Sequence, residues 1–161
     1  MPTATDIWLA EHLSVDCNAS WTVNGFEMIC IKGKVSMNGQ VHFPHETCGG
    51  TGKLWLLRKP CRADDHNEHG QCSSERYDEG VGLNFYVEVC DGRGWLPDIS
   101  YDTLKAAARA QGWSITIETR DKGDFVCIYD TEGDEIGRCF SSVRDTAAVT
   151  LAMARAAGMP E

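Results

Sequence analysis

The sequence predicts an α+β protein in which an antiparallel β-rich module is followed by a small α/β/α sandwich. Three observations favour this class: two Asn-Gly pairs between β-prone segments, a concentration of cysteine and histidine in the middle of the chain, and a helix–strands–helix order after Pro97. We therefore expect two units, residues 1–97 and residues 98–161.

The N-terminal part of the chain is predicted to form a meander. Asn24-Gly25 and Asn38-Gly39 are each a two-residue turn signal, because a tight hairpin turn needs both residues at positive φ. The segments on either side of these turns are the expected strands, residues 21–23, 26–31, 35–37 and 40–43. A short helix at about residues 6–13 precedes them.

Two apolar runs follow the meander, residues 54–57 and residues 83–89. A polar stretch without apolar periodicity separates them, so we interpret them as one hairpin with a long loop. In the antiparallel register of such a hairpin, Cys48 and Cys90 meet at one end, and Cys61 and Cys72 lie near the other.

The second unit begins with a capped helix. Ser100 is the expected N-cap of a helix that ends at Gly112. Residues 113–118, 125–129 and 136–140 are the expected strands, and Ser141-Ser142 is expected to open an Ala-rich helix that runs to about Gly158. Helices at both ends of a short sheet are most simply packed as layers.

Composition and net charge disfavour two classes of function, direct nucleic-acid binding and membrane spanning. The chain has 161 residues and a net charge of -9, so most of its surface repels phosphate and direct nucleic-acid binding is disfavoured. No stretch approaches the roughly 18 apolar residues that cross a bilayer, and the first residues lack the features of a secretory signal. We expect a cytoplasmic, acidic protein without membrane contact, whose eight cysteines bind metal or are buried as thiols.

Cysteine and histidine form two candidate zinc sites between residues 42 and 94. Structural zinc takes four thiolate or imidazole ligands, often as pairs two to four residues apart, and His45-x2-Cys48 and His69-x2-Cys72 have that spacing. The loop from Cys61 to Cys72 also holds His66, which makes a complete ligand set of Cys61, His66, His69 and Cys72. In the second candidate, Cys48 and Cys90 are joined by His45 and His42.

The same glycine pattern follows two of these cysteines, Cys48-Gly-Gly50-Thr-Gly52 and Cys90-Asp-Gly92-Arg-Gly94. Glycine at these positions lets backbone amides turn back towards a thiolate. The remaining cysteines, Cys17, Cys30, Cys127 and Cys139, lie on apolar or strand-like stretches and are expected to pack in the core.

Residues 42–95 resemble the Cys-x-x-Cys-x-Gly-x-Gly zinc repeats of the cysteine-rich domain of DnaJ-type chaperones. The resemblance implies that the first and last repeats share one zinc and the inner repeats another, although His45 and Val87 stand where cysteines begin the repeats of that family. Residues 98–158 are similar in texture to the α/β/α sandwich domain of uncharacterised phage proteins. That likeness implies an accessory protein in the host cytoplasm, in a class that includes anti-CRISPR inhibitors of host defence.

Two functions remain open from the sequence. The first is a non-enzymatic zinc-binding protein whose metal fixes a surface for a protein partner. The second is a small zinc-dependent hydrolase or deaminase-like enzyme, which needs an open position on the metal. The His-x-Glu and Pro-Cys-x-x-Cys pattern of deaminases and the His-Glu-x-x-His helix are both missing from the sequence, and this favours the binding protein.

Overall fold

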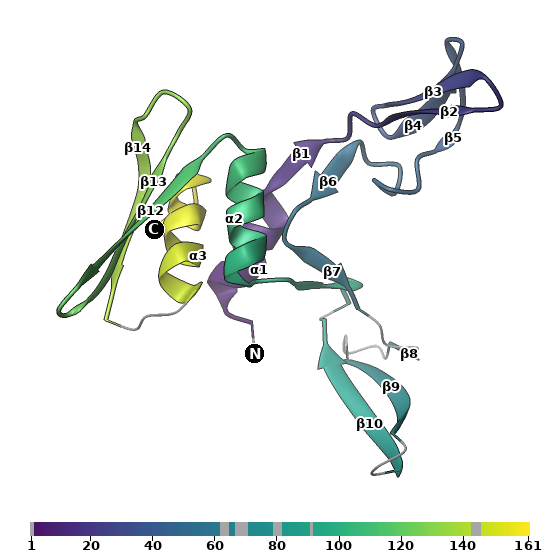
Figure 1. The fold of residues 1–161 in the computed structure, drawn as a ribbon. Coiled ribbons are helices and arrows are strands. Elements are labelled where there is room, and N and C mark those ends of the chain that lie inside the picture. The colour runs from purple at the N-terminus through teal and green to yellow at the C-terminus, as the bar shows by residue number, and fades with distance from the viewer. Residues whose placement is uncertain (1, 62–64, 67–70, 79–81, 91, 143–145) are drawn as a thin grey trace.

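The fold consists of a helix-covered sheet with two β-arms that extend from it (Figure 1). The computed structural model describes residues 2–61, 65–66, 71–78, 82–90, 92–142 and 146–161. We refer to the helices and their sheet as the body, to β2–β5 as the first arm, to β8–β10 as the second arm, and to β1, β6, β7 and β11 as the neck.

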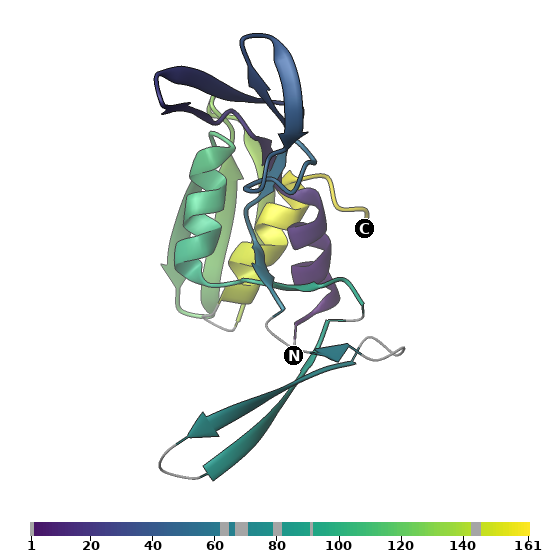
Figure 2. The same cartoon turned by 90° about the vertical axis from the view of Figure 1, so that its right-hand side faces the viewer.

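The body contains the antiparallel sheet β12-β13-β14 and three helices. Its strands are β12 (Ser114–Arg120), β13 (Gly123–Tyr129) and β14 (Glu135–Ser141), and its helices are α1 (Ala4–His12), α2 (Tyr101–Ala110) and α3 (Thr146–Ala156). Figures 1 and 2 show the helices together on one side of this sheet. Among the described residues no helix covers the other face, so the second helical layer of an α/β/α sandwich is not confirmed.

One apolar core holds the body together. Leu9 of α1, Leu104 of α2, Ile128 of β13 and Met153 of α3 are all fully buried in it. Helix α3 lies directly on β14, because a Cβ added to Gly137 would meet the Ala152 carbonyl oxygen at 2.3 Å. The same core includes Leu57 of the neck, so both predicted units contribute to it.

The first arm is the four-stranded sheet β2-β3-β4-β5. Its strands are β2 (Ser20–Val23), β3 (Phe26–Ile31), β4 (Lys34–Met37) and β5 (Gln40–Pro44), each antiparallel to the next. The predicted meander and both Asn-Gly turns are confirmed, since Asn24, Gly25, Asn38 and Gly39 all have positive φ.

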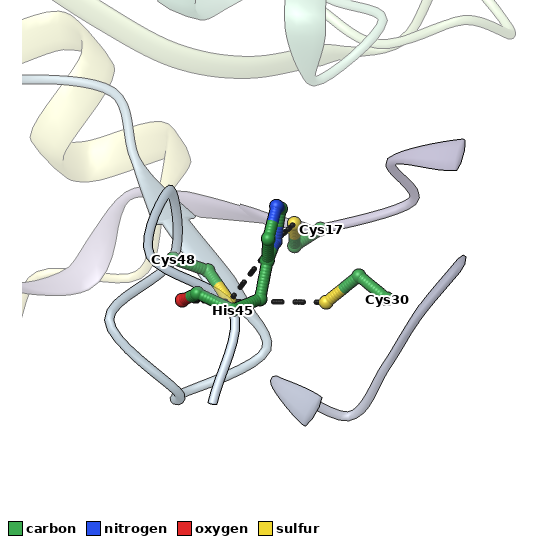
Figure 3. A group of neighbouring side chains, drawn as sticks. All are labelled: Cys17, Cys30, His45 and Cys48. Carbon is green, nitrogen blue, oxygen red and sulfur yellow. Dashed lines mark hydrogen bonds between the residues drawn. The ribbon is translucent and has the colours of Figure 1, made fainter. Parts of the chain in front are cut away.

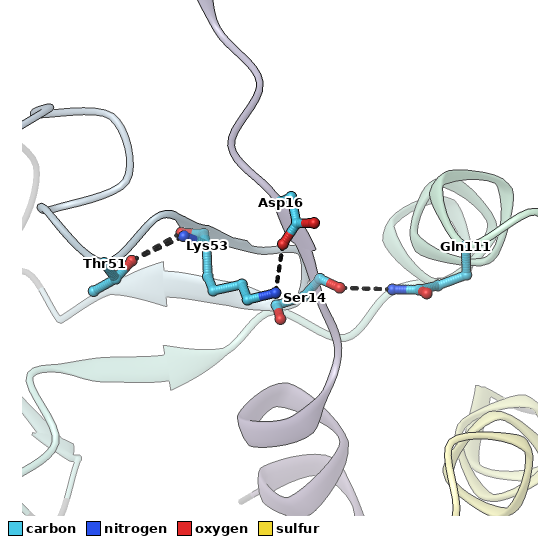
Figure 4. Close-up of polar contacts among 5 residues, drawn as sticks. All are labelled: Ser14, Asp16, Thr51, Lys53 and Gln111. Atoms are coloured by element: carbon cyan, nitrogen blue, oxygen red, sulfur yellow. Dashed lines mark hydrogen bonds and ion pairs between the residues drawn. The ribbon is translucent and has the colours of Figure 1, made fainter. Parts of the chain in front are cut away.

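The neck consists of two short ladders that carry the arms. Strand β1 (Ser14–Asp16) pairs with β6 (Lys53–Trp55), and β7 (Arg58–Pro60) pairs with β11 (Trp95–Pro97). Figure 4 shows how the first ladder is fastened: Lys53 pairs with Asp16, and Gln111 after α2 donates to the Ser14 carbonyl oxygen at 2.8 Å.

A second fastening lies where the two ladders meet the body. The Arg58 guanidinium carbon lies 3.8 Å from the ring centroid of Trp55 and 4.0 Å from that of Trp95. Its Nε donates to the Ala10 carbonyl oxygen at 2.9 Å. One arginine therefore links both ladders of the neck to helix α1.

The second arm comprises β8 (Asp65–His66), β9 (Gln71–Asp78) and β10 (Gly82–Val89), in the order β10-β9-β8. This pairing corrects the predicted hairpin of residues 54–57 with residues 83–89. Residues 53–55 pair with β1 instead, and β10 pairs with its sequence neighbour β9. The physical reason is that β9 offers β10 a full ladder after a short connection, whereas residues 54–57 are divided by a turn.

The other predicted elements agree with the structure at their centres. Ser100 caps α2 through a reciprocal pair of hydrogen bonds with Thr103, and Gly112 follows that helix at positive φ. At the last helix, Ser141 proves to be the final residue of β14, and the structure describes α3 from Thr146 onwards. Within the described residues, no helix is both long enough and apolar enough to cross a membrane.

Candidate metal centre

Four metal-ligating side chains meet at the base of the first arm. They are Cys17, Cys30, His45 and Cys48, and their ligand atoms all lie within 4.8 Å of one another. Each of the four residues is only 4% to 9% exposed. Figure 3 shows the three thiols gathered around the His45 ring from separate chain segments.

Backbone hydrogen bonds fix where each ligand enters the cluster. Cys17 follows β1, and its amide donates to the Gly52 carbonyl oxygen at 2.9 Å. Cys30 lies near the end of β3, and its amide donates to Ala19 at 2.9 Å. His45 follows β5 and donates its amide to the Gly33 carbonyl oxygen at 2.8 Å.

The separations between ligand atoms match the edges of a metal tetrahedron. With Zn–S near 2.3 Å and Zn–N near 2.0 Å, tetrahedral geometry requires about 3.8 Å between sulfurs and about 3.5 Å between sulfur and nitrogen. The Cys30 and Cys48 sulfurs are 3.8 Å apart. His45 Nδ1 lies 3.8 Å from the Cys48 sulfur and 3.3 Å from the Cys17 sulfur. The cluster can therefore hold a metal ion without a large rearrangement.

The surroundings of Cys48 lower the pKa of its thiol and so favour the thiolate that binds a cation. Burial raises the pKa of Cys48, but hydrogen bonds from the backbone amides of Gly52 and Gly50, and from Cys30 and His45, lower the pKa to a net value of about 6. Burial raises the pKa of the neighbouring Cys30 thiol to about 11, with a further contribution from Cys17. Cys48 is therefore a thiolate at neutral pH before any metal binds.

Two glycine-containing turns press together beside the cluster. Gly33, in the turn between β3 and β4, has φ +88°, and a Cβ placed there would lie 2.2 Å from the Gly50 carbonyl oxygen. This clash is with backbone, which cannot move aside without displacing the turn that carries Cys48. Only glycine at position 33 lets the Cys30 turn and the Cys48 turn approach closely enough to share one ion.

The core of the first arm is made largely of the ligands themselves. Cys17, Cys30 and Cys48 form a separate buried cluster, against which only Ala19 and Leu54 pack among the described residues. The His45 ring is stacked on Trp21 of β2, with ring centroids 5.0 Å apart and planes 18° from parallel. A core this small gives little apolar stabilisation, and a metal is the usual substitute.

The structure brings only part of the predicted Cys48 site together. Cys48 and His45 are in the cluster, but Cys90 lies between β10 and β11, and the hairpin register that predicted its meeting with Cys48 is wrong. His42 is exposed in the middle of β5. The two ligands that complete the cluster are Cys17 and Cys30.

The other predicted site consists of Cys61, His66, His69 and Cys72, and the structure describes the backbone at Cys61, His66 and Cys72. Cys61 follows β7 and is half-buried, and the β8–β9 ladder places His66 opposite Cys72. His69 lies outside the described residues. Zinc at Cys61, His66, His69 and Cys72 stays a prediction.

Sequence reasoning missed Cys17 and Cys30 because apolar neighbours suggested simple core packing. A signal was present for Cys30, since Gly33 follows it by three residues and ends the strand in a tight turn. Cys17 had no comparable signal, because the short strand β1 that places it has only three residues.

Comparison of the chain with protein-family models, with curated proteins and with solved structures finds no match.

Proposed function

We propose that this is a non-enzymatic binding protein in which a structural zinc ion, held by Cys17, Cys30, His45 and Cys48, fixes the first arm as a docking surface for a protein partner. The observation that carries the proposal is the closed set of four buried donors.

Zinc is the metal that the donors favour. Three thiolates and one imidazole suit zinc, whereas calcium and magnesium prefer oxygen ligands. The tetrahedral edge of about 3.8 Å between two sulfurs also agrees with the separation of the Cys30 and Cys48 sulfurs. Absence of disulfides among the described cysteines leaves the thiols available for a metal.

Four protein donors favour a structural role over the alternative of a zinc hydrolase or deaminase. A catalytic zinc keeps one position for water or substrate, and a structural zinc takes all four ligands from the protein. Here the fourth position is filled by a buried protein donor, and the ligand residues are nearly inaccessible to solvent. The metal is therefore proposed to build the arm rather than to carry a reaction.

The surface that this metal supports is apolar. Strand register puts Val23 opposite Phe26, Met28 opposite Met37, and the fully buried Val35 opposite Phe43 on one face of the first arm. Val23 is 46% exposed, and Phe26 and Phe43 are each 51% exposed. Large exposed apolar side chains gathered on one face are typical of protein interaction sites.

Charge favours a protein over a nucleic acid as the partner of this face. Residues 14–56 contain three acidic and three basic residues, so the arm and its ladder are neutral, although the whole chain carries -9. A neutral apolar sheet lacks the excess of basic groups that neutralises phosphates. The expected role as a phage accessory or anti-CRISPR protein, which concerns the identity of the partner, stays a prediction.

A pair of matched variants tests the surface. Phe26→Ser with Phe43→Ser removes the two aromatic rings from the first arm, and Phe140→Ser removes a ring of equal exposure from β14 of the body. Affinity capture from the source cell, with each purified protein as bait and quantitative mass spectrometry, should lose the partner with the double variant only. Equal capture by both variants would contradict the docking surface.

Removal of zinc with a chelator tests whether partner binding depends on the metal. Elemental analysis should find zinc in the purified protein, and removal of zinc should abolish capture of the same partner. Capture that survives complete zinc removal would contradict the proposed role of the metal, even if the apolar face proved to be the site of binding.

A further inference from the structure

A second cysteine pair, Cys61 and Cys90, occupies a backbone frame that repeats the frame of Cys17 and Cys48. The amide of Cys17 donates to the Gly52 carbonyl oxygen at 2.9 Å, and the amide of Cys61 donates to the Gly94 carbonyl oxygen at 3.0 Å. In each case the acceptor is the last glycine of the Cys-x-Gly-x-Gly motif that contains the partner cysteine.

The two Cys-x-Gly-x-Gly turns agree in one backbone hydrogen bond and in the φ angles of their last two glycines. The amide of Thr51 donates to the Cys48 carbonyl oxygen at 3.1 Å, and that of Arg93 donates to the Cys90 carbonyl oxygen at 3.0 Å. The glycines agree as well: φ is 80° and 75° at positions 50 and 52, and 75° and 77° at positions 92 and 94.

The flanking ladders complete the repeat. Asp16, just before Cys17, pairs with Lys53, just after the first turn. Pro60, just before Cys61, pairs with Trp95, just after the second turn. Each frame therefore consists of a short antiparallel ladder, a cysteine that follows its first strand, and a cysteine turn that precedes its second strand.

The first frame brings its two cysteine sulfurs within metal-binding separation, at no more than 4.8 Å. The repeated frame gives the Cys61 and Cys90 side chains matching starting points on the backbone, from which the rotamers of Cys17 and Cys48 would bring the two sulfurs together. Cys90 is fully buried, and Cys61 is half-buried. An arm grows out of each frame, β2–β5 from the first and β8–β10 from the second (Figure 1).

A third cysteine has the corresponding spacing along the chain in the second repeat. Cys30 precedes Cys48 by 18 residues, and Cys72 precedes Cys90 by the same 18 residues. The β9–β10 ladder pairs Cys72 with Glu88, only two residues before Cys90. The β8–β9 ladder then pairs His66 with the same Cys72.

We propose a second zinc centre with Cys61, Cys72 and Cys90 as thiolate ligands and His66 as the fourth ligand. Like the first centre it has three thiolates and one imidazole, a donor set that suits tetrahedral zinc. The chain is then built as two zinc-held arms on one neck. This centre does not depend on the proposed role of the first arm as a docking surface.

Metal stoichiometry of the full-length protein tests the second centre. Elemental analysis should find two zinc ions per chain in the unmutated protein, one in Cys90→Ser, one in Cys30→Ser and none in the double variant. Cys139→Ser, which alters a buried cysteine of the body, should keep two. A single zinc that Cys30→Ser loses and Cys90→Ser keeps would overturn the second centre and leave the first standing.

Replacement of zinc by cobalt tests the same centre, first in the unmutated protein and then in two histidine variants. The intensities of the tetrahedral ligand-field and thiolate charge-transfer bands should grow until two Co²⁺ ions are bound, and saturation at one ion would overturn the second centre. His66→Ala should weaken the binding of one of the two ions, whereas His69→Ala should leave both titrations unchanged. The reverse result would overturn the assignment of His66 as the fourth ligand.

Discussion

Replacement of Cys30 by serine removes one of four metal donors and should weaken zinc binding at the first centre by two to three orders of magnitude. Structural zinc is bound with an apparent free energy of about 10 to 16 kcal/mol. Divided over the four donors of the cluster, that is about 2.5 to 4 kcal/mol per ligand, or roughly 100- to 1,000-fold in the metal dissociation constant.

The matched control for Cys30→Ser is Cys139→Ser. Both cysteines are buried, but Cys139 lies in the apolar core of the body and is not a member of the cluster. Competition titration with a chelating dye gives the dissociation constants, and the imidazole resonances of His45 in isotope-labelled protein report on this centre separately from any other bound metal. Equal zinc affinity in the unmutated protein and Cys30→Ser would refute the cluster as a metal centre.

Two further predictions concern the turns and the thiolate of this centre. Gly33→Ala should lower the melting temperature of the zinc-loaded arm more than Gly25→Ala does, because both glycines have positive φ but only position 33 faces the Gly50 carbonyl; equal losses in the two variants would contradict the close approach of the turns. In the metal-free, reduced protein, the lowered pKa of Cys48 should make stability rise between pH 6 and pH 9, since the contribution of a thiolate is complete above the ordinary pKa of 9.0 and is lost as the pH falls to about 6. Urea unfolding across this range checks the sign, and a pH profile that Cys48→Ser leaves unchanged would show that another group is responsible.

Local patterns in the sequence were sufficient to predict elements whose signals are local. The Asn24-Gly25 and Asn38-Gly39 turns, the Ser100 cap and the three strands of the body each depend on residues within a few positions of one another. These are the parts of the fold in which prediction and structure agree, apart from boundary shifts at the strand and helix ends.

Strand partners could not be obtained in the same way. Residues 83–89 have the composition of a strand, but nothing in that composition distinguishes β9 from residues 54–57 as the partner. The true partner of β6 is the three-residue strand β1, whose composition gives no signal at all. The wrong pairing of residues 83–89 with residues 54–57 placed Cys90 next to Cys48 in the prediction. Cys90 was therefore included wrongly among the ligands of the Cys48 site.

The candidate centre shows why ligand spacing alone was insufficient. His45 and Cys48 were found because they are three residues apart, a spacing that bends one turn around an ion. Cys17 and Cys30 reach the same point from strands that begin outside this turn, and only the three-dimensional structure brings them there. Their apolar neighbours, which suggested packing, are also what a metal cluster at the base of a thin arm requires.

The distribution of apolar residues explains why the body is stabilised by an apolar core and why the first arm needs another source of stability. The body has a continuous core that includes Leu9 of α1 and Met153 of α3, so apolar burial suffices to hold the two ends of the chain together. The first arm has no such core, since few apolar side chains pack on its three buried cysteines in the described structure. It keeps Phe26 and Phe43 exposed instead of using them to build one. The proposed metal at the base would resolve this conflict, because it would stabilise the arm through Cys30 while Phe26 and Phe43 stay exposed for a partner.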